Sequence, residues 1–330
     1  MKINLNDHES SDLINFANLK LGLFNSKSFL NLKELIEFKD ISLGFPLLLN
    51  KNNKFFLLRA SSNKFKVDKN FFRKYIYKVD NKNYGPLINF FKKGDFFLND
   101  VELKKKYNLE YKKIYNHNKK LISFIKKLKK NKKKVTAFQT RNIPHLGHEK
   151  IINFLLKKTD YLIINPVIGP KKKGDIKYEY LEKFYKSIIK KKYNPRKVFY
   201  YPVIANMYYS GPREAVHHSI LRKNLGFDQF LVGRDHAGAE NAYHPDAAFK
   251  IVKKLSKNLG IKVLAYKGSY FCKTCNKVVE KDACKSKKLK CKYLDISGKE
   301  FRAHIKNRKY FKFADIDLQK YIFRFKNIFS

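Results

Sequence analysis

The sequence predicts an α/β protein whose main domain is a parallel β-sheet covered by helices. From residue 133 onward, apolar runs that suit strands alternate with stretches of helical periodicity. The expected strands are 135–138, 161–165, 197–203, 229–232 and 261–265, and the expected helices are 148–158, 178–191, 212–225 and 245–258. This alternation favours a sheet that is covered on both faces and that binds ligands at the carboxyl ends of its strands.

The residues before this region have a different composition and predict a mostly β domain. The short apolar segments Phe45–Leu49 and Lys54–Leu58 are separated by polar residues, and Lys51–Asn53 is the expected hairpin connection. A helix over 119–130, followed by a charged run, places a domain boundary near residue 132. We therefore expect domains at 1–132, 133–268 and 269–330, the last holding a small cysteine-rich module and a helix over 316–325.

A polar loop follows the first of these strands and leads into a helix that is expected to begin near His148. The loop reads Gln139-Thr140-Arg141-Asn142-Ile143-Pro144-His145-Leu146-Gly147-His148. The free N–H groups and the positive dipole end of such a helix attract an anion. Arg141, His145 and His148 have the same preference, so the loop is a candidate phosphate site. The alternative is two partly exposed histidines with no ligand.

A second loop of this kind follows the strand expected at 229–232 and reads Gly233-Arg234-Asp235-His236-Ala237-Gly238. Its glycines permit close approach of the backbone, and the planar fork of Arg234 suits a tetrahedral oxyanion. Two anion loops at strand ends indicate nucleotide phosphate chemistry. The chain has no Gly-x-Gly-x-x-Gly motif, and its 169–175 segment lacks the Lys-Ser/Thr end of a P-loop. These absences argue against a dinucleotide enzyme and a P-loop kinase.

The composition is strongly basic, with 73 Lys and Arg against 28 Asp and Glu and a formal net charge of +45. Such an excess is typical of nucleic-acid-binding proteins. However, lysine runs such as 126–134 come with abundant Asn, Ile, Phe and Tyr and no Trp, a bias that AT-rich coding imposes on any protein. We therefore expect no specific nucleic-acid partner. No apolar run has the length of a membrane span and no signal-peptide pattern is found, so we expect a cytoplasmic protein without a membrane partner.

The four cysteines lie in one segment, as Cys272-x2-Cys275-x8-Cys284-x6-Cys291. Clustered cysteines fit a reducing compartment and a metal better than disulfides. Four thiolates at this spacing can surround one Zn²⁺ tetrahedrally, with no open position for catalysis. The sequence therefore predicts a structural zinc site, and free buried cysteines are the alternative.

Four segments together resemble the sulfate adenylyltransferase (ATP sulfurylase) family. They are 139–149, 165–175, 207–238 with its long Met207-to-Ala215 block, and Ile296-Ser297-Gly298 with Arg302. The resemblance implies a Rossmann-like nucleotidyltransferase domain after a PUA-like domain, in a single-function form without an APS kinase domain. It also implies a homo-oligomer that converts ATP, used with Mg²⁺, and sulfate into adenylyl sulfate (APS) and diphosphate. Some relatives bind zinc with three cysteines and a histidine, and Cys291 is the candidate replacement for that histidine here.

The same resemblance assigns roles to individual residues. Thr140, Arg141 and Asn142 would form the reacting centre, and Gln139, Arg141, Arg234 and Ala237 would hold sulfate. The residues that would bind ATP are Gln139, Thr140, Arg141, Asn142, His145, His148, Gly233, Arg234, Asp235 and His236. His217 and His218, within the helix after Pro212, are expected to be scaffold or surface residues, because adjacent helical positions face different directions.

Two alternatives stay open at this level. One is a basic RNA-binding protein with a vestigial catalytic domain, and the other is a different adenylyltransferase that shares the His-x-Gly-His loop. The intact anion loops argue against the first and the block 211–238 against the second. The sequence does not choose between APS synthesis and ATP production from APS.

Overall fold

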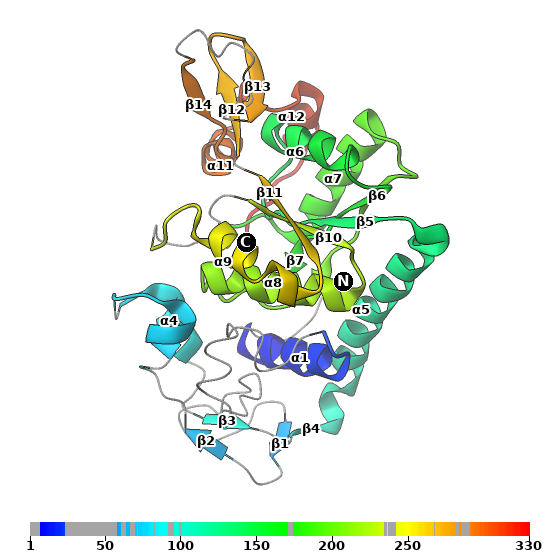
Figure 1. The fold of residues 1–330 in the computed structure, drawn as a ribbon, viewed down its shortest axis with the longest axis vertical. Helices are drawn as coiled ribbons and strands as arrows, with labels where there is room; N and C mark the ends of the chain where they lie inside the picture. Colours follow the sequence, from blue (N-terminus) through cyan, green and yellow to red (C-terminus); the bar gives the residue numbers. More distant parts are fainter. Residues whose placement is uncertain are drawn as a thin grey trace. The chain divides into compact units, whose positions relative to one another are not determined.

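The computed structural model describes most of the chain from residue 101 onward and several shorter segments before it. The described residues are 7–23, 58–60, 64–66, 70, 72–81, 83–91, 96–98, 101–170, 174–233, 236, 242–266, 268–280, 284 and 291–330. They form two compact units (Figure 1), the first from 1–127, 167–170 and 203–263, and the second from 128–166, 171–202 and 264–330.

The second unit is built on a parallel sheet with strands in the order β5-β6-β8, of which β5 and β6 are labelled in Figure 1. The strands are β5 (Val135–Phe138), β6 (Tyr161–Ile164) and β8 (Val198–Tyr200), with Val135 opposite Tyr161 and Leu162 opposite Val198. The helices α6 (Leu146–Leu156) and α7 (Tyr178–Lys192) connect them. Every residue of β5 is buried, as expected for a parallel strand that is covered on both faces. The predicted parallel α/β architecture is confirmed.

The helices of this unit are held by both apolar and charged contacts. α7 buries residues at helical spacing, Leu181, Phe184, Tyr185, Ile188 and Ile189. At its end, Lys192 contacts Glu149 of α6 at 2.9 Å and Asp315 at 3.0 Å. Asp315 also caps α12 (Ile316–Ile322) by accepting a hydrogen bond from the Leu318 N–H. These carboxylates fix the ends of three helices that support the sheet.

The rest of the second unit is a small antiparallel sheet and one further helix. The sheet has the order β13-β12-β14, formed by β12 (Ser269–Cys272), β13 (Lys277–Glu280) and β14 (Tyr293–Asp295). The helix α11 (Gly298–Lys306) follows directly, with the Ser297 side chain as its N-cap. The C-terminal residues return to the unit, where the Ser330 N–H donates to the Asp175 carbonyl.

The first unit is mainly helical among its described residues. Its helices are α1 (Asp7–Lys20), α4 (Gly85–Phe91), α5 (Asn108–Leu128), α8 (Pro212–Leu225), α9 (Ala247–Lys254) and α10 (Ser256–Leu259), with a π-helical turn at Phe72–Tyr77. Its strand pairs are β1 (Leu58–Ala60) with β4 (Val101–Leu103), β2 (Lys64–Lys66) with β3 (Phe96–Leu98), and β7 (Val167–Ile168) with β9 (Val203–Ile204). β10 (Gln229–Gly233) neighbours β11 (Lys262–Tyr266).

A buried amide connects three elements of this unit. Asn118 of α5 donates to the Ile204 carbonyl at 2.9 Å and to Asn18 Oδ1 of α1 at 2.7 Å, and it accepts from the Ile204 N–H at 3.0 Å. Since buried amides are costly when unpaired, this set of bonds fixes α1 and α5 against β9.

Most elements from residue 133 onward match the sequence-based expectations to within two residues, and three differ more. The strand expected at 197–203 is two strands, β8 and β9, because Tyr201-Pro202 interrupts it and proline cannot donate to a ladder. The helix expected at 245–258 breaks at Leu255 into α9 and α10. The helix expected at 316–325 ends earlier, at Ile322.

The N-terminal region differs more. The helix expected at 119–130 is the end of α5, which begins at Asn108 and buries Ile114, Asn118, Leu121 and Ile125 at helical spacing. In the described part of 1–132, helices α1, α4 and α5 hold more residues than the four short strands, so a mostly β content is not found there. Apart from Leu58, the hairpin expected around Lys51–Asn53 lies outside the described residues. In the described part of the chain, no helix has the length and apolar character needed to cross a bilayer.

Candidate functional site

The loop that follows β5 places its two histidines at the start of α6. The helix begins at Leu146, two residues before the predicted start, because His145 is its N-cap. The Gly147 N–H donates to His145 Nδ1 at 3.1 Å, which leaves the proton of a neutral His145 ring on Nε2. The helix start therefore places an imidazole N–H donor at the positive end of the α6 dipole, an arrangement that favours an anion. The Leu146 and Gly147 N–H groups themselves donate to the Phe313 carbonyl and to His145 Nδ1.

His145 and His148 are both buried, 6% and 7% exposed, and their rings stack with centroids 3.9 Å apart. Burial, followed by the proximity of His148, holds the pKa of His145 well below its ordinary value. Burial also lowers the pKa of His148 to about 4. Thr140 Oγ1 lies 3.1 Å from His148 Nε2 and orients that ring. Both rings are thus neutral at pH 7 and can offer N–H groups, but no full charge, to an anion.

Gly147 is required between the two histidines for steric reasons. A Cβ at this position would lie 2.9 Å from the His145 ring and 3.3 Å from Ser269 Cβ. The hydroxyl of Ser269, on β12, also donates to the Gly147 carbonyl at 3.0 Å. The cysteine-bearing sheet therefore supports the histidine pair directly.

Asn142 is held from three sides. The Tyr185 hydroxyl of α7 donates to its carbonyl at 3.3 Å, and the Arg302 guanidinium of α11 donates to its Oδ1. A Cβ on Gly298 would lie 2.6–2.9 Å from the Asn142 carboxamide, so only glycine leaves room for this side chain. The Ile296-Ser297-Gly298 segment and Arg302 thus act on the loop by positioning Asn142.

Arg141 supplies the exposed charge of the loop. Its side chain is 42% exposed and its Nη1 lies 4.0 Å from Asp175 Oδ2. Burial lowers the pKa of Arg302, and Arg141 adds to this lowering, whereas Asp175 opposes it. Arg141 and Arg302 thus carry two positive charges beside one carboxylate, that of Asp175. An anion bound between them would reduce their mutual repulsion, so this charge arrangement favours anion binding.

The second predicted loop is described only in part. Gly233 is the last residue of β10, and His236 is described, but Arg234, Asp235 and Ala237 lie outside the described residues. The positions of these three, and the predicted meeting of the two loops at one ligand, remain predictions.

Behind His236 lies a buried polar cluster on α8 that the sequence analysis missed. Glu214 Oε1 accepts from the Tyr208 N–H at 3.1 Å, and Oε2 accepts from Ser210 N at 3.2 Å and Ser210 Oγ at 3.0 Å. His218 Nε2 lies 3.1 Å from Glu214 Oε1, and His218 Nδ1 lies 2.9 Å from His236 Nε2. The signal was available in the sequence, because Glu214 and His218 are four residues apart on one helix. His217 and His218 are buried and not on the surface.

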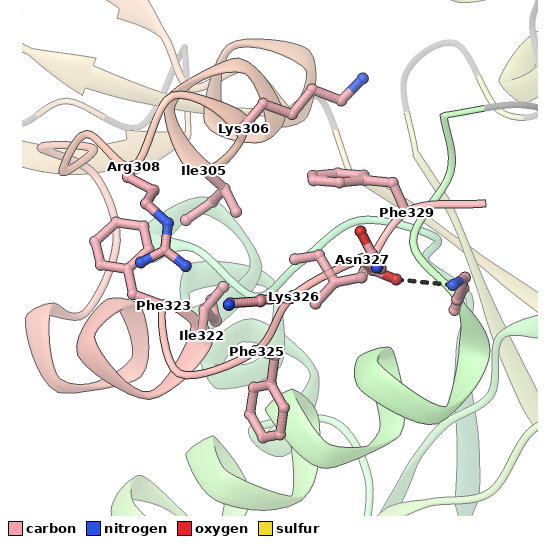
Figure 2. Close-up of a pocket in the computed structure, with 11 residues that line it drawn as sticks. Ile305, Lys306, Arg308, Ile322, Phe323, Phe325, Lys326, Asn327 and Phe329 are labelled. Carbon is pink, nitrogen blue, oxygen red and sulfur yellow. Dashed lines mark hydrogen bonds between the residues drawn. The ribbon is translucent and has the colours of Figure 1, made fainter.

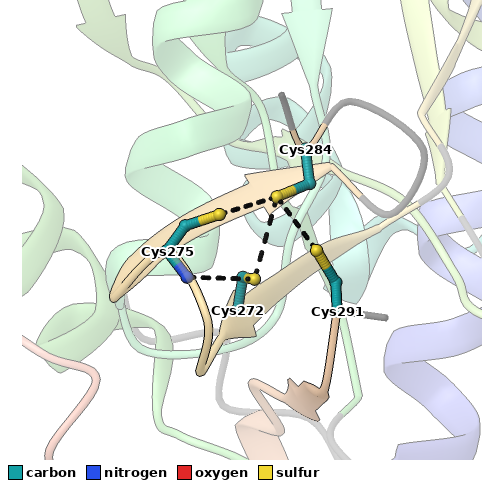
Figure 3. A group of neighbouring side chains, drawn as sticks. All are labelled: Cys272, Cys275, Cys284 and Cys291. Atoms are coloured by element: carbon teal, nitrogen blue, oxygen red, sulfur yellow. Dashed lines mark hydrogen bonds between the residues drawn. The ribbon is translucent and has the colours of Figure 1, made fainter. Parts of the chain in front are cut away.

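The four cysteines converge on one point in the small sheet (Figure 3). Their sulfur atoms all lie within 4.8 Å of one another, and Cys284 Sγ is 2.8 Å, 3.4 Å and 3.8 Å from those of Cys275, Cys291 and Cys272. Four thiolates at about 2.3 Å from a zinc ion would be separated by roughly 3.7 Å. The donor set and spacing fit a tetrahedral metal ion, as the cysteine pattern predicts.

A separate cavity of about 690 Å³ lies beside the C-terminal segment (Figure 2). Its lining combines phenylalanine rings with cationic side chains, among them Arg308 and Lys326. Lys177, also in the lining, donates to the Asn327 carbonyl at 2.8 Å. None of the residues assigned to the reacting centre lines this cavity.

These features define a class of protein: a parallel-sheet α/β protein with a histidine-capped helix after its strand β5. A hexameric APS kinase from Thiobacillus denitrificans has a similar fold, with a TM-score of 0.59 over 96% of this chain and 61% of its own, at 10% sequence identity. At that identity the likeness concerns the fold alone.

The family model for ATP-sulfurylase matches residues 113–310, and the chain belongs to this family. A sulfate adenylyltransferase from Ignicoccus hospitalis is 39% identical over 228 residues, covering 67% of this chain and 57% of the relative. One from Staphylothermus marinus is 31% identical over 276 residues, covering 83% and 68%. One from Pyrococcus abyssi is 44% identical over 153 residues, covering 46% and 40%. The chain thus spans about half the length of the curated relatives that it matches.

Proposed function

We propose that this protein is a sulfate adenylyltransferase, which transfers the adenylyl group of ATP to sulfate and releases diphosphate, reversibly. The observation that carries the proposal is the grouping of Thr140, Asn142, His145 and His148 at the carboxyl end of β5, beside the exposed guanidinium of Arg141. Family membership and the names of the relatives support the same activity. No comparison supports the alternative of an RNA-binding protein with a vestigial site.

The reaction calls for charge neutralisation and alignment more than for a base. Sulfate is a weak, doubly negative nucleophile that must approach the α-phosphorus in line with the leaving diphosphate. The His145 Nε2–H and His148, at the positive end of the α6 dipole, would hold the ATP phosphates and stabilise the departing diphosphate. Thr140, Arg141 and Asn142 would surround the transferred group, with Asn142 held in place by Arg302 and Tyr185.

The second loop would complete the site. Gln139, Arg141, Arg234 and the backbone of Ala237 would hold sulfate, and Gly233, Arg234, Asp235 and His236 would line the nucleotide. Support for this assignment comes from the position of Gly233 at the end of β10, where ligands of α/β sheets bind. ATP would enter as its Mg²⁺ complex, in which the metal screens the phosphate charge.

We also propose that the four cysteines bind structural zinc, with Cys291 as the fourth ligand. The closed set of four thiol donors, with no other side chain of this kind beside it among the described residues, supports a structural role. We propose further that residues 1–132 have a PUA-like fold and that domain limits lie at 132 and 268. We also propose that the protein forms a homo-oligomer and that it is cytoplasmic. The hexameric state of the fold neighbour supports homo-oligomer formation, and the four cysteines, which form no disulfide, support the cytoplasmic location.

ATP–diphosphate exchange tests the proposed activity. The purified chain should exchange labelled diphosphate into ATP only when sulfate is present. Exchange that is equally fast without sulfate would indicate a different adenylyltransferase, and absence of exchange under both conditions would contradict the proposal. Chloride at equal ionic strength is the control, because a chain of charge +45 is expected to respond to salt in general.

A further inference from the structure

The buried pair Glu214 and His218 has no role in the reaction as proposed, yet it contacts a residue of the nucleotide loop. Glu214 and His218 are 0% exposed. The contacts run in one line, from Glu214 Oε1 to His218 Nε2 at 3.1 Å, and from His218 Nδ1 to His236 Nε2 at 2.9 Å. Burying these groups is costly unless each polar atom has a defined partner.

The positions of the protons in this line follow from the chemistry of the groups. Glu214 Oε1 lies 3.1 Å from His218 Nε2, outside hydrogen-bond geometry, and a carboxylate this close repels a bare nitrogen lone pair, so the proton of His218 is on Nε2. Neutral His218 then has a bare Nδ1, which can only accept. His236 Nε2 must donate to it and carries the proton. Neutral His236 is left with a bare Nδ1 on the other side of its ring.

Burial and the nearby Arg222 charge keep both rings neutral. Burial, followed by the Arg222 guanidinium, holds the pKa of His218 well below its ordinary value. Burial, then His218 and Arg222, do the same for His236, against the weaker opposing effect of Glu214. Arg222 itself is fully buried over the Phe230 ring, 5.1 Å from its centroid. No second proton is therefore expected on His236 near pH 7.

We infer that Glu214 and His218 are positioning residues that fix His236 as its Nε2–H tautomer, so that its Nδ1 accepts a hydrogen bond from a donor group of the nucleotide. The inference rests on the proposed function only for the identity of the ligand. His236 then does not bind phosphate, which offers no donor, in contrast to His145, whose Nε2–H can donate to it. The groups that fit are a ribose hydroxyl and the adenine amino group. Among the described residues, no hydrogen bond to His236 Nδ1 is found.

The tautomer can be measured without any substrate. In the full chain labelled with ¹⁵N-histidine, the ring nitrogens of His236 should show a proton on Nε2 and none on Nδ1 at pH 7, and His218 should show the same pattern. His218→Leu should release His236 to a mixture of tautomers. A protonated Nδ1 on His236 in the unsubstituted chain would overturn the inference, whatever the enzyme's activity.

The recognised group is identified by direct binding of ATP, 2′-deoxy-ATP, 3′-deoxy-ATP and inosine triphosphate, measured by calorimetry. The unsubstituted chain should bind one of the three analogues roughly ten- to a hundredfold more weakly than ATP, as expected for loss of one hydrogen bond to a buried acceptor. His236→Leu should remove that preference, and His218→Leu should reduce it. A preference that is unchanged in His236→Leu would overturn the inference.

His217→Leu is the matched control, because it removes a neighbouring buried imidazole on the same helix that is outside this line of contacts. It should leave the preference among nucleotides intact. If the unsubstituted chain binds no nucleotide, the proposed function fails, while the tautomer measurement still decides the arrangement of the three residues.

Discussion

Replacing Gly298 with alanine is expected to lower sulfate-dependent exchange by about 10²–10³-fold, the range found when one transition-state contact is lost. The new Cβ would lie 2.6–2.9 Å from the Asn142 carboxamide, which must move and lose its bond from Arg302. The fold should tolerate the change, since alanine is intrinsically better than glycine in a helix by roughly 0.5–1 kcal/mol. Steady-state exchange and thermal unfolding of the same preparation measure both effects.

A double-mutant cycle isolates the cause of this loss. Once Asn142 is alanine, the added Cβ has no carboxamide to displace, so Gly298→Ala should cost little more. Lys299→Ala is the control for a substitution in the same turn, because Lys299 is exposed. Additive losses in the double variant would contradict the role given to Gly298.

Replacing Cys284 with serine should abolish metal binding and destabilise the second unit. Cys284 is buried and its sulfur contacts the other three, so its loss leaves an incomplete donor set. Since zinc binding is coupled to folding, we expect zinc content to fall from one per chain to near zero. The melting temperature should fall by about 6–12 °C, the shift that a loss of about 3 kcal/mol causes in a domain of this size.

Chelation provides the matched comparison. A strong chelator should lower the melting temperature of the unsubstituted chain toward that of Cys284→Ser and leave the variant unchanged. Exchange activity should also fall, because Ser269 on the same sheet supports the Gly147 carbonyl. A zinc-free chain with unchanged stability would favour the alternative of free buried cysteines.

The sequence predicted those parts of the fold that depend on local pattern. The bounds of α8 and β5 match the expected ranges because their ends carry clear signals, Pro212 in the first turn of α8 and Gly226 just after it, and the polar loop after β5. The start of α6 was predicted two residues late, because a histidine N-cap is not among the usual capping residues. The length of α5 was underestimated because its exposed positions are mostly lysine, with Asn108 and Asn116 in its first half, so its apolar period is sparse there.

The sequence predicted the site only where its residues lie close together in the chain as part of one motif. Thr140, His145 and His148 lie in one short loop and the start of the helix after it, so the sequence predicts that they are close together. The structure brings them together. The contacts of Asn142 with Tyr185 and Arg302 join residues 43 and 160 positions apart, and no local pattern specifies such pairs. The line from Glu214 to His236 was missed for the same reason, since its last step joins a helix to a loop.

The most direct test of the central claim measures the incorporation of labelled sulfate into a nucleotide. The chain is incubated with Mg²⁺, ATP, ³⁵S-labelled sulfate and a pyrophosphatase that removes diphosphate, and nucleotides are separated by anion-exchange chromatography. The proposed function predicts a labelled product that comigrates with adenylyl sulfate, with two phosphates formed from the released diphosphate per labelled molecule. Consumption of ATP with no label in any nucleotide, or no reaction at all by folded, metal-replete protein, would contradict it.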